Sequence, residues 1–296
     1  MKKIICVLLC AALAFSLCAC KSNESEKNAE TAELKIVYDS AYSTYDSSVV
    51  SAYENLCRAV MAGEKSVRLN LGLSEKVMRL FYTSFPLSAL VESLTPAENG
   101  EGFEIGYKLD DSEHKKAVND FTVKINSVLG EIQSYNKNIY AINAYHYVAS
   151  NAKVSEDAAI DCYNTVIKGE GTSFSYAQLL AYLLLLGGVP ACYVVASDVS
   201  NASWGLVLVQ LNENWYYLDP LGEFYDNKGE QLRFFGMTAK DIKNTGLSHP
   251  VYSDDSKAVD SSSLYFDALR ICKSYEIKEN SLLVNTFEGN VVKIEL

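Results

Sequence analysis

Ser173 is the residue of this chain whose setting is most typical of a reactive group. It lies in residues 169–177, which read Gly-Glu-Gly-Thr-Ser-Phe-Ser-Tyr-Ala, and the apolar run after it predicts a buried helix that begins near this serine. A helix N-terminus favours a nucleophile, because the helix dipole stabilises negative charge there. A serine hydroxyl still needs a neighbouring base before it can attack a carbonyl. Catalysis by Ser173 would therefore require a base from another part of the chain.

Three further landmarks follow Ser173 in order. The helical run ends at residues 187–190, Gly-Gly-Val-Pro, and a strand-like Cys-Tyr-Val-Val follows at 192–195. Residues 202–204 read Ala-Ser-Trp, and residues 215–220 read Trp-Tyr-Tyr-Leu-Asp-Pro. This order resembles the transglutaminase-like superfamily, whose core is similar to that of papain-type cysteine proteases. The signature of that superfamily runs Gly-x-Cys-x-x-Tyr-Ala, Gly-[Ile/Val]-Pro, His-Ala-Trp and Trp-Tyr-x-x-Asp-Pro.

The resemblance implies a catalytic triad of which two members are replaced. Ser173 stands at the position of the nucleophilic cysteine, Ala202 at that of the histidine, and Asp219 alone is kept. In the family the histidine exchanges protons with the thiol, and the aspartate fixes the histidine tautomer. We therefore expect no catalytic residues at these three positions. The resemblance also makes three aromatic residues candidates for lining the former cleft: Tyr176, Trp204 and Trp215.

Another base could in principle serve Ser173, because triads are defined by geometry and not by order along the chain. The chain has three histidines: His114 opens a long helical run, His146 lies in a tyrosine-rich run, and His249 precedes a proline. Lys168 is a weaker alternative, five residues before the serine. A relocated pair with one of these residues stays open as an active hydrolase or acyltransferase of protease or transglutaminase type.

The N-terminus has the features of a bacterial lipoprotein signal. Lys2 and Lys3 precede an apolar stretch over residues 4–17, which is too short to span a bilayer as a mature helix. Residues 17–20, Leu-Cys-Ala-Cys, resemble a lipobox, with cleavage after residue 19 and acylation of Cys20. An ordinary secretory signal is the alternative. Residues 20–33 are polar and predict a flexible tether, so we expect an extracytoplasmic protein that contacts membrane lipid through acylated Cys20.

The charge of the chain excludes some partners. The formal net charge is −11, and removal of residues 1–19 takes away two lysines and no acid, which makes it −13. Such an acidic surface argues against nucleic acid as a partner. No nucleotide, metal or redox motif is present, so we expect no cofactor and no metal site. Four cysteines remain beyond the leader and Cys20, and their wide spacing predicts buried residues with at most one disulfide, namely Cys57, Cys162, Cys192 and Cys272.

The sequence predicts an α+β fold in two parts after the tether. Residues 34–134 form a smaller α/β unit, and residues 135–296 form the transglutaminase-like domain, a helix packed on an antiparallel sheet, with C-terminal strands. Strands are expected at 66–71, 87–94, 103–109, 190–197, 204–211, 214–219 and 231–235. Residues 38–61 are expected to form one helix or two, and further helices are expected at 74–83, 111–132 and 138–150.

The residues favour a cell-envelope binding or scaffolding module over an enzyme. A retained frame without its reactive groups would hold a peptide, protein or envelope polymer in the former cleft. A third hypothesis places the useful surface in the N-terminal unit, with the core as its support. Substitution of Trp204 or Tyr176 would distinguish these hypotheses, because only a cleft binder should lose its ligand.

Overall fold

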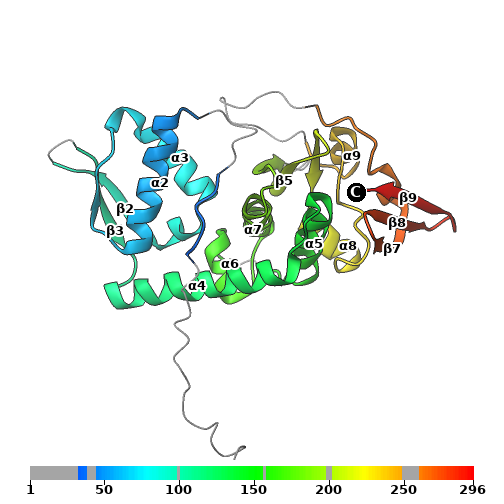
Figure 1. The fold of residues 1–296 in the computed structure, drawn as a ribbon, viewed down its shortest axis with the longest axis horizontal. Coiled ribbons are helices and arrows are strands. Elements are labelled where there is room, and N and C mark those ends of the chain that lie inside the picture. Colours follow the sequence, from blue (N-terminus) through cyan, green and yellow to red (C-terminus); the bar gives the residue numbers. More distant parts are fainter. Residues whose placement is uncertain (1–32, 39–44, 99–100, 156–157, 198–201, 249–259) are drawn as a thin grey trace, which may run out of the picture. The chain divides into compact units, whose positions relative to one another are not determined.

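The computed structural model describes residues 33–38, 45–98, 101–155, 158–197, 202–248 and 260–296. Residues 34–296 form one compact unit (Figure 1). The leader over residues 1–19, nearly all of the tether, Cys20 and His249 lie outside the described residues. The boundary between residues 134 and 135 stays a prediction.

The N-terminal part combines helices with a small antiparallel sheet whose strand order is β1-β3-β2. The apolar face of its first helix is buried from Val49 to Val60, as the three- and four-residue spacing predicts. Its elements are α2 (Ser47–Ala62), β1 (Ser66–Val67), η1 (Leu71–Leu73), α3 (Ser74–Ser84), η2 (Pro86–Leu90), β2 (Val91–Pro96) and β3 (Phe103–Tyr107).

Two strand predictions in this part are wrong at their ends. The strand expected at 66–71 is limited to Ser66–Val67, because β3 pairs with it only through Phe103 and Glu104. The strand expected from residue 87 begins at Val91. Pro86 instead opens a turn of 3₁₀ helix, since proline has the backbone angle that a first helical residue needs and no N–H to leave unpaired.

The helices that follow lead to α7, which is the centre of the fold. Asp110 accepts hydrogen bonds from the backbone N–H groups of Ser112 and Glu113, which fixes the start of the long helix α4. Helix α7 packs against α5 and α6 as well as against strands β4 and β5, and ten of its residues are buried. The four helices are α4 (Asp111–Ile132), α5 (Lys137–Ser150), α6 (Cys162–Lys168) and α7 (Ser173–Leu186).

The sheet beside α7 has the order β4-β5-β6 and is antiparallel throughout. Its strands are β4 (Ala191–Ser197), β5 (Ser203–Leu211) and β6 (Asn214–Leu218). Val207 and Val209 pack with the α7 side chains, whereas Leu206 and Leu208 belong to a second apolar cluster on the other face. Both faces are therefore covered, which explains why β5 reads as an almost continuous apolar run. The predicted α+β class, with a helix packed on an antiparallel sheet, is confirmed.

The C-terminal part contains short helices and a third antiparallel sheet, β7-β8-β9. Residues 231–235, expected as a strand, form a loop instead. Phe234 N–H donates to a side chain, the buried carboxylate of Glu223, and Leu232 adopts a positive φ of 59°, so the ladder of a strand cannot form there. The elements are α8 (Pro220–Asn227), α9 (Ala239–Asn244), η3 (Asp267–Ile271), β7 (Cys272–Lys278), β8 (Ser281–Thr286) and β9 (Val291–Glu295).

The four cysteines beyond the leader are free thiols, and Cys57, Cys162 and Cys272 are buried. Burial raises the pKa of the Cys57 and Cys162 thiols far above the ordinary value, so neither is poised as a thiolate. Within the described ranges, no helix combines the length and the apolar character that crossing a bilayer demands.

Candidate functional site

Ser173 is the first residue of α7, and its hydroxyl faces the backbone of β5. The side chain is buried, with 6% of its surface exposed. Its Oγ accepts a hydrogen bond from Gly205 N–H at 3.2 Å. One residue earlier, Thr172 N–H donates to Ser175 Oγ at 2.9 Å, which satisfies a backbone donor at the helix start. Ser173 therefore joins the first turn of α7 to the middle sheet strand.

Gly205 makes this approach possible because it has no Cβ. An added Cβ at Gly205 would lie 2.6 Å from Ser173 O and 2.7 Å from Phe174 Cα, closer than side-chain atoms approach a backbone. Strand β6 ends at Leu218, opposite Val207, so no residue of β6 extends far enough to pair with Gly205. Because β6 ends before it could pair with Gly205, the N–H of Gly205 donates to the Ser173 hydroxyl instead.

Asp219 starts the helix that follows β6. Its Oδ1 accepts a hydrogen bond from Gly222 N–H at 2.8 Å, and its Oδ2 accepts one from Trp204 Nε1 at 3.0 Å. The carboxyl is 4% exposed, and burial raises its pKa to about 6, even though these two hydrogen bonds act in the opposite direction. Asp219 is thus a helix cap whose second oxygen is held by an indole.

The structure does not place a described base beside Ser173. Ala202, exposed and immediately before β5, has no ionisable group. His114 Nε2 contacts Val60 O at 2.7 Å, and His146 Nδ1 contacts Gly229 O at 2.9 Å. Among the described residues, the only hydrogen-bond partner given to the Ser173 hydroxyl is therefore Gly205 N–H, and not an imidazole.

Cys162 and His146 do not form a catalytic pair with each other either. Cys162 opens α6, where its N–H donates to Gln178 Oε1 at 3.2 Å. His146 lies on α5, and its Nδ1 also lies 3.2 Å from the hydroxyl of Tyr275. Lys168 is the last residue of α6 and is exposed. Cys162 and His146 therefore have structural contacts away from Ser173.

The aromatic candidates lie at different places. Trp204 is next to the site through its bond to Asp219. Tyr176 is buried one turn after Ser173, and its hydroxyl accepts from Lys153 N–H at 2.7 Å and donates to Lys153 O at 3.0 Å. Trp215 is half-buried on β6 and packs with the second apolar cluster. The structure therefore brings Ser173, Trp204 and Asp219 to one end of the sheet. Tyr176 instead holds the loop at Lys153 by two hydrogen bonds.

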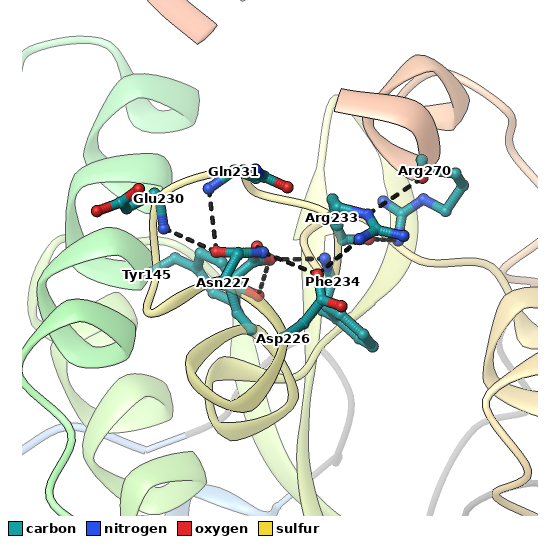
Figure 2. A network of polar contacts seen from close by, with 9 residues as sticks. Tyr145, Asp226, Asn227, Glu230, Gln231, Arg233, Phe234 and Arg270 are labelled. Atoms are coloured by element: carbon teal, nitrogen blue, oxygen red, sulfur yellow. Dashed lines mark hydrogen bonds and ion pairs between the residues drawn. The ribbon is translucent and has the colours of Figure 1, made fainter. Parts of the chain in front are cut away.

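A second buried carboxylate adjoins the site and was missed from the sequence. Glu223 is fully buried on α8; its Oε2 accepts from Tyr145 OH at 2.8 Å and from Phe234 N–H at 2.7 Å. Its Oε1 accepts from Asn227 Nδ2 at 2.5 Å. Figure 2 shows Tyr145, Asn227 and Phe234 converging here. The signal in the sequence, Asp-Pro-x-x-Glu at 219–223, is that of an ordinary helix start, so it does not reveal this network.

Two cavities lie away from Ser173. A cavity of about 440 Å³ lies between α3, η2, α7 and β4, and a second of about 280 Å³ lies between α4, α5, α6 and α7. Ser173, Trp204 and Asp219 line neither of them. Within the described ranges, no group of three His, Cys, Asp or Glu side chains is placed to hold a metal ion.

Comparison with known proteins finds only partial likenesses. No family model matches the chain, and no curated protein matches it. EGTA-treated LapG of Legionella pneumophila is 15% identical over 36% of this chain and 62% of its own, with a TM-score of 0.27. A protein described as a TGase is 14% identical over 54% of this chain and 50% of its own, with a TM-score of 0.31. The chain thus spans less than two thirds of either protein.

Substitution Gly205→Ala tests the contact between α7 and β5. The added methyl group would collide with backbone atoms of Ser173 and Phe174. We therefore expect the free energy of unfolding, measured by urea titration, to fall by roughly 1–3 kcal/mol. Gly130→Ala is the matched control, because nothing lies within 4 Å of a Cβ at that exposed position of α4. The control should be as stable as the wild type or more stable. Equal stability of both variants would contradict the tight contact.

The raised pKa of Asp219 predicts a stability that depends on pH. Because the folded state holds this proton more tightly than the unfolded chain, Asp219 weakens the fold as pH rises from about 4 to about 6, with no further effect above. The difference in unfolding free energy between wild type and Asp219→Asn should fall by roughly 3 kcal/mol across that window. Urea titrations of both proteins at pH 4, 5, 6 and 7 measure it. A difference that stays constant, or grows with pH, would refute the assignment.

Proposed function

We propose that this chain is an exported protein, lipid-anchored to a bacterial membrane, whose transglutaminase-like core binds a peptide, protein or envelope polymer without processing it. The observation that carries the proposal is the hydrogen bond of Ser173, whose Oγ accepts from the backbone N–H of Gly205. In a serine or cysteine hydrolase, the nucleophile also gives its proton to a neighbouring base, and no described residue is placed to take the proton of Ser173. A buried serine whose hydroxyl accepts from the backbone of the middle sheet strand is a structural group.

Asp219 supports the same proposal. In the family this carboxylate orients a histidine, whereas here its two oxygens hold Gly222 N–H and Trp204 Nε1. Asp219 therefore has a structural role that does not depend on catalysis, because it caps α8 and accepts the hydrogen bond of the half-buried Trp204 indole. The order of motifs from Gly171 to Pro220 supports descent from an enzyme of this class.

The rival function is an active hydrolase or acyltransferase that uses Ser173 with a base outside the family pattern. The position of Ser173 at the first residue of α7 favours this rival, since a helix N-terminus stabilises developing negative charge. It would require an imidazole or amine to reach the hydroxyl of a residue that is 6% exposed. Binding without chemistry needs no such rearrangement.

A fluorophosphonate probe separates the two functions. We expect no labelling of the folded wild-type chain above the level of Ser173→Ala, because Ser173 Oγ is buried and lacks a described base. In parallel, neither protein should incorporate a biotinylated amine into casein. Labelling of wild type that disappears in Ser173→Ala would overturn the binding proposal and establish the hydrolase. A trypsin sample in the same assay controls for probe quality.

The proposed anchor is tested at Cys20. With an alkyne-tagged palmitate in a bacterial host, the wild-type chain should carry label and sediment with membranes, whereas Cys20→Ser should lose both properties, because acylation needs that thiol. Cys18→Ser is the matched control, two residues away, and should keep the label. Label that survives in Cys20→Ser would contradict the lipoprotein assignment and favour an ordinary secretory signal.

A further inference from the structure

Strand β4 is an edge strand of its sheet. The order β4-β5-β6 leaves β4 with a strand partner on one side only, among the residues that the structure describes. An edge strand presents unpaired N–H and C=O groups, which can pair with another extended chain. The edge of β4 is already used in this way at one end, because Ser248 N–H donates to Ser197 O at 2.6 Å and Ser197 N–H donates to Ser248 Oγ at 3.1 Å.

The bonds of Ser197 show which residues of β4 direct their backbone groups outward. Both polar groups of Ser197 point away from β5, and in an antiparallel pair inward and outward residues alternate. The backbone N–H and C=O groups of Tyr193 and Val195 therefore also point away from β5. Gln210 N–H donates to Pro190 O at 2.9 Å, which independently places the even-numbered residues inward. No described backbone group outside the sheet pairs with the N–H or C=O of Tyr193 or Val195.

The 440 Å³ cavity runs along this same edge. Four consecutive residues of β4, from Ala191 to Val194, line it. Residues of α7, including Ala181 and Leu185, line it together with residues of α3 and η2, and the lining also includes polar side chains such as Asp161 and Gln178. Tyr193 faces α7, as its packing against Phe174 shows, with ring centroids 6.5 Å apart. A strand laid beside β4 would therefore direct every second side chain into the cavity.

We propose that the outer edge of β4 and the adjoining cavity bind an extended peptide segment of a partner protein by strand addition. The outward N–H and C=O groups of Tyr193 and Val195 pair with its backbone. Apolar side chains at alternate positions of the peptide enter the cavity over α7. The inference goes beyond binding near Ser173, since Ser173 does not line this cavity.

The chemistry of the edge favours a peptide over an envelope polysaccharide. A strand presents donors and acceptors at the regular spacing of another strand, and only a peptide backbone repeats that pattern. Apolar side chains of such a peptide that reach Ala181 and Leu185 gain from leaving water.

Selection from a phage library of random twelve-residue peptides tests the proposal on the full-length chain. We expect enrichment of sequences with alternating apolar residues. Val195→Pro removes the outward N–H, while Val194 and Ala196 keep their hydrogen bonds to β5, so the enriched peptides should bind this variant about tenfold more weakly. Peptides that are N-methylated at alternate residues should likewise bind the wild type about tenfold more weakly. Val195→Thr, which keeps the N–H, should bind within about twofold.

Amide hydrogen exchange of the unliganded chain provides a reading that does not depend on any peptide. Tyr193 and Val195 amides should exchange fast, and Val194 and Ala196 amides should exchange slowly, because only the latter pair with β5. Protection of all four would mean that the chain covers its own edge and would overturn the proposal. Selection that yields no enrichment, or peptides insensitive to Val195→Pro and N-methylation, would also overturn it, without affecting the inactivity proposed for Ser173.

Discussion

The contact between the first turn of α7 and the backbone of β5 at Gly205 is the constraint on which the core depends. Helix α7 packs against α5, α6 and two strands, so any displacement of its N-terminal end would open gaps on several sides at once. Gly205 lets the two backbones approach, and Ser173 supplies the acceptor that the strand needs where β6 ends. A small polar residue at 173 is thus required by the packing itself, whether or not it reacts.

The same end of the sheet carries two buried carboxylates, and each is stabilised by a different means. Asp219 is held by an indole and a helix N-terminus, and its pKa rises because burial outweighs those two bonds. Glu223 accepts three hydrogen bonds, one of them from Tyr145 on α5. Buried charges need such partners, since an unpaired charge away from water is costly. Together the two residues connect α5, α8 and the loop at Phe234 to the sheet.

The parts of the fold that follow from side-chain periodicity could be predicted. Helices α4, α5 and α7 and the hairpin of β5 and β6 lie close to their expected positions, because one face or the whole element is apolar. Residues 231–235 do not form the expected strand, because the carboxylate of Glu223 accepts the hydrogen bond from Phe234 N–H. At the site, Ser173 and Asp219 could be located from their motifs. Their partners could not, because Gly205 acts through its missing side chain and Glu223 through tertiary contacts.

A reactive site and a closed packing contact place opposite demands on the same serine. A nucleophile must reach its substrate and must give its proton to a base, which requires an open cleft and a mobile hydroxyl. Ser173 instead lies 6% exposed against a glycine backbone, and the cavity of about 440 Å³ lies on the other side of β4. The close contact of Ser173 with Gly205 instead serves the packing of α7 on the sheet. We therefore expect a partner to bind along the edge of β4, where backbone hydrogen-bonding groups remain unpaired beside a cavity.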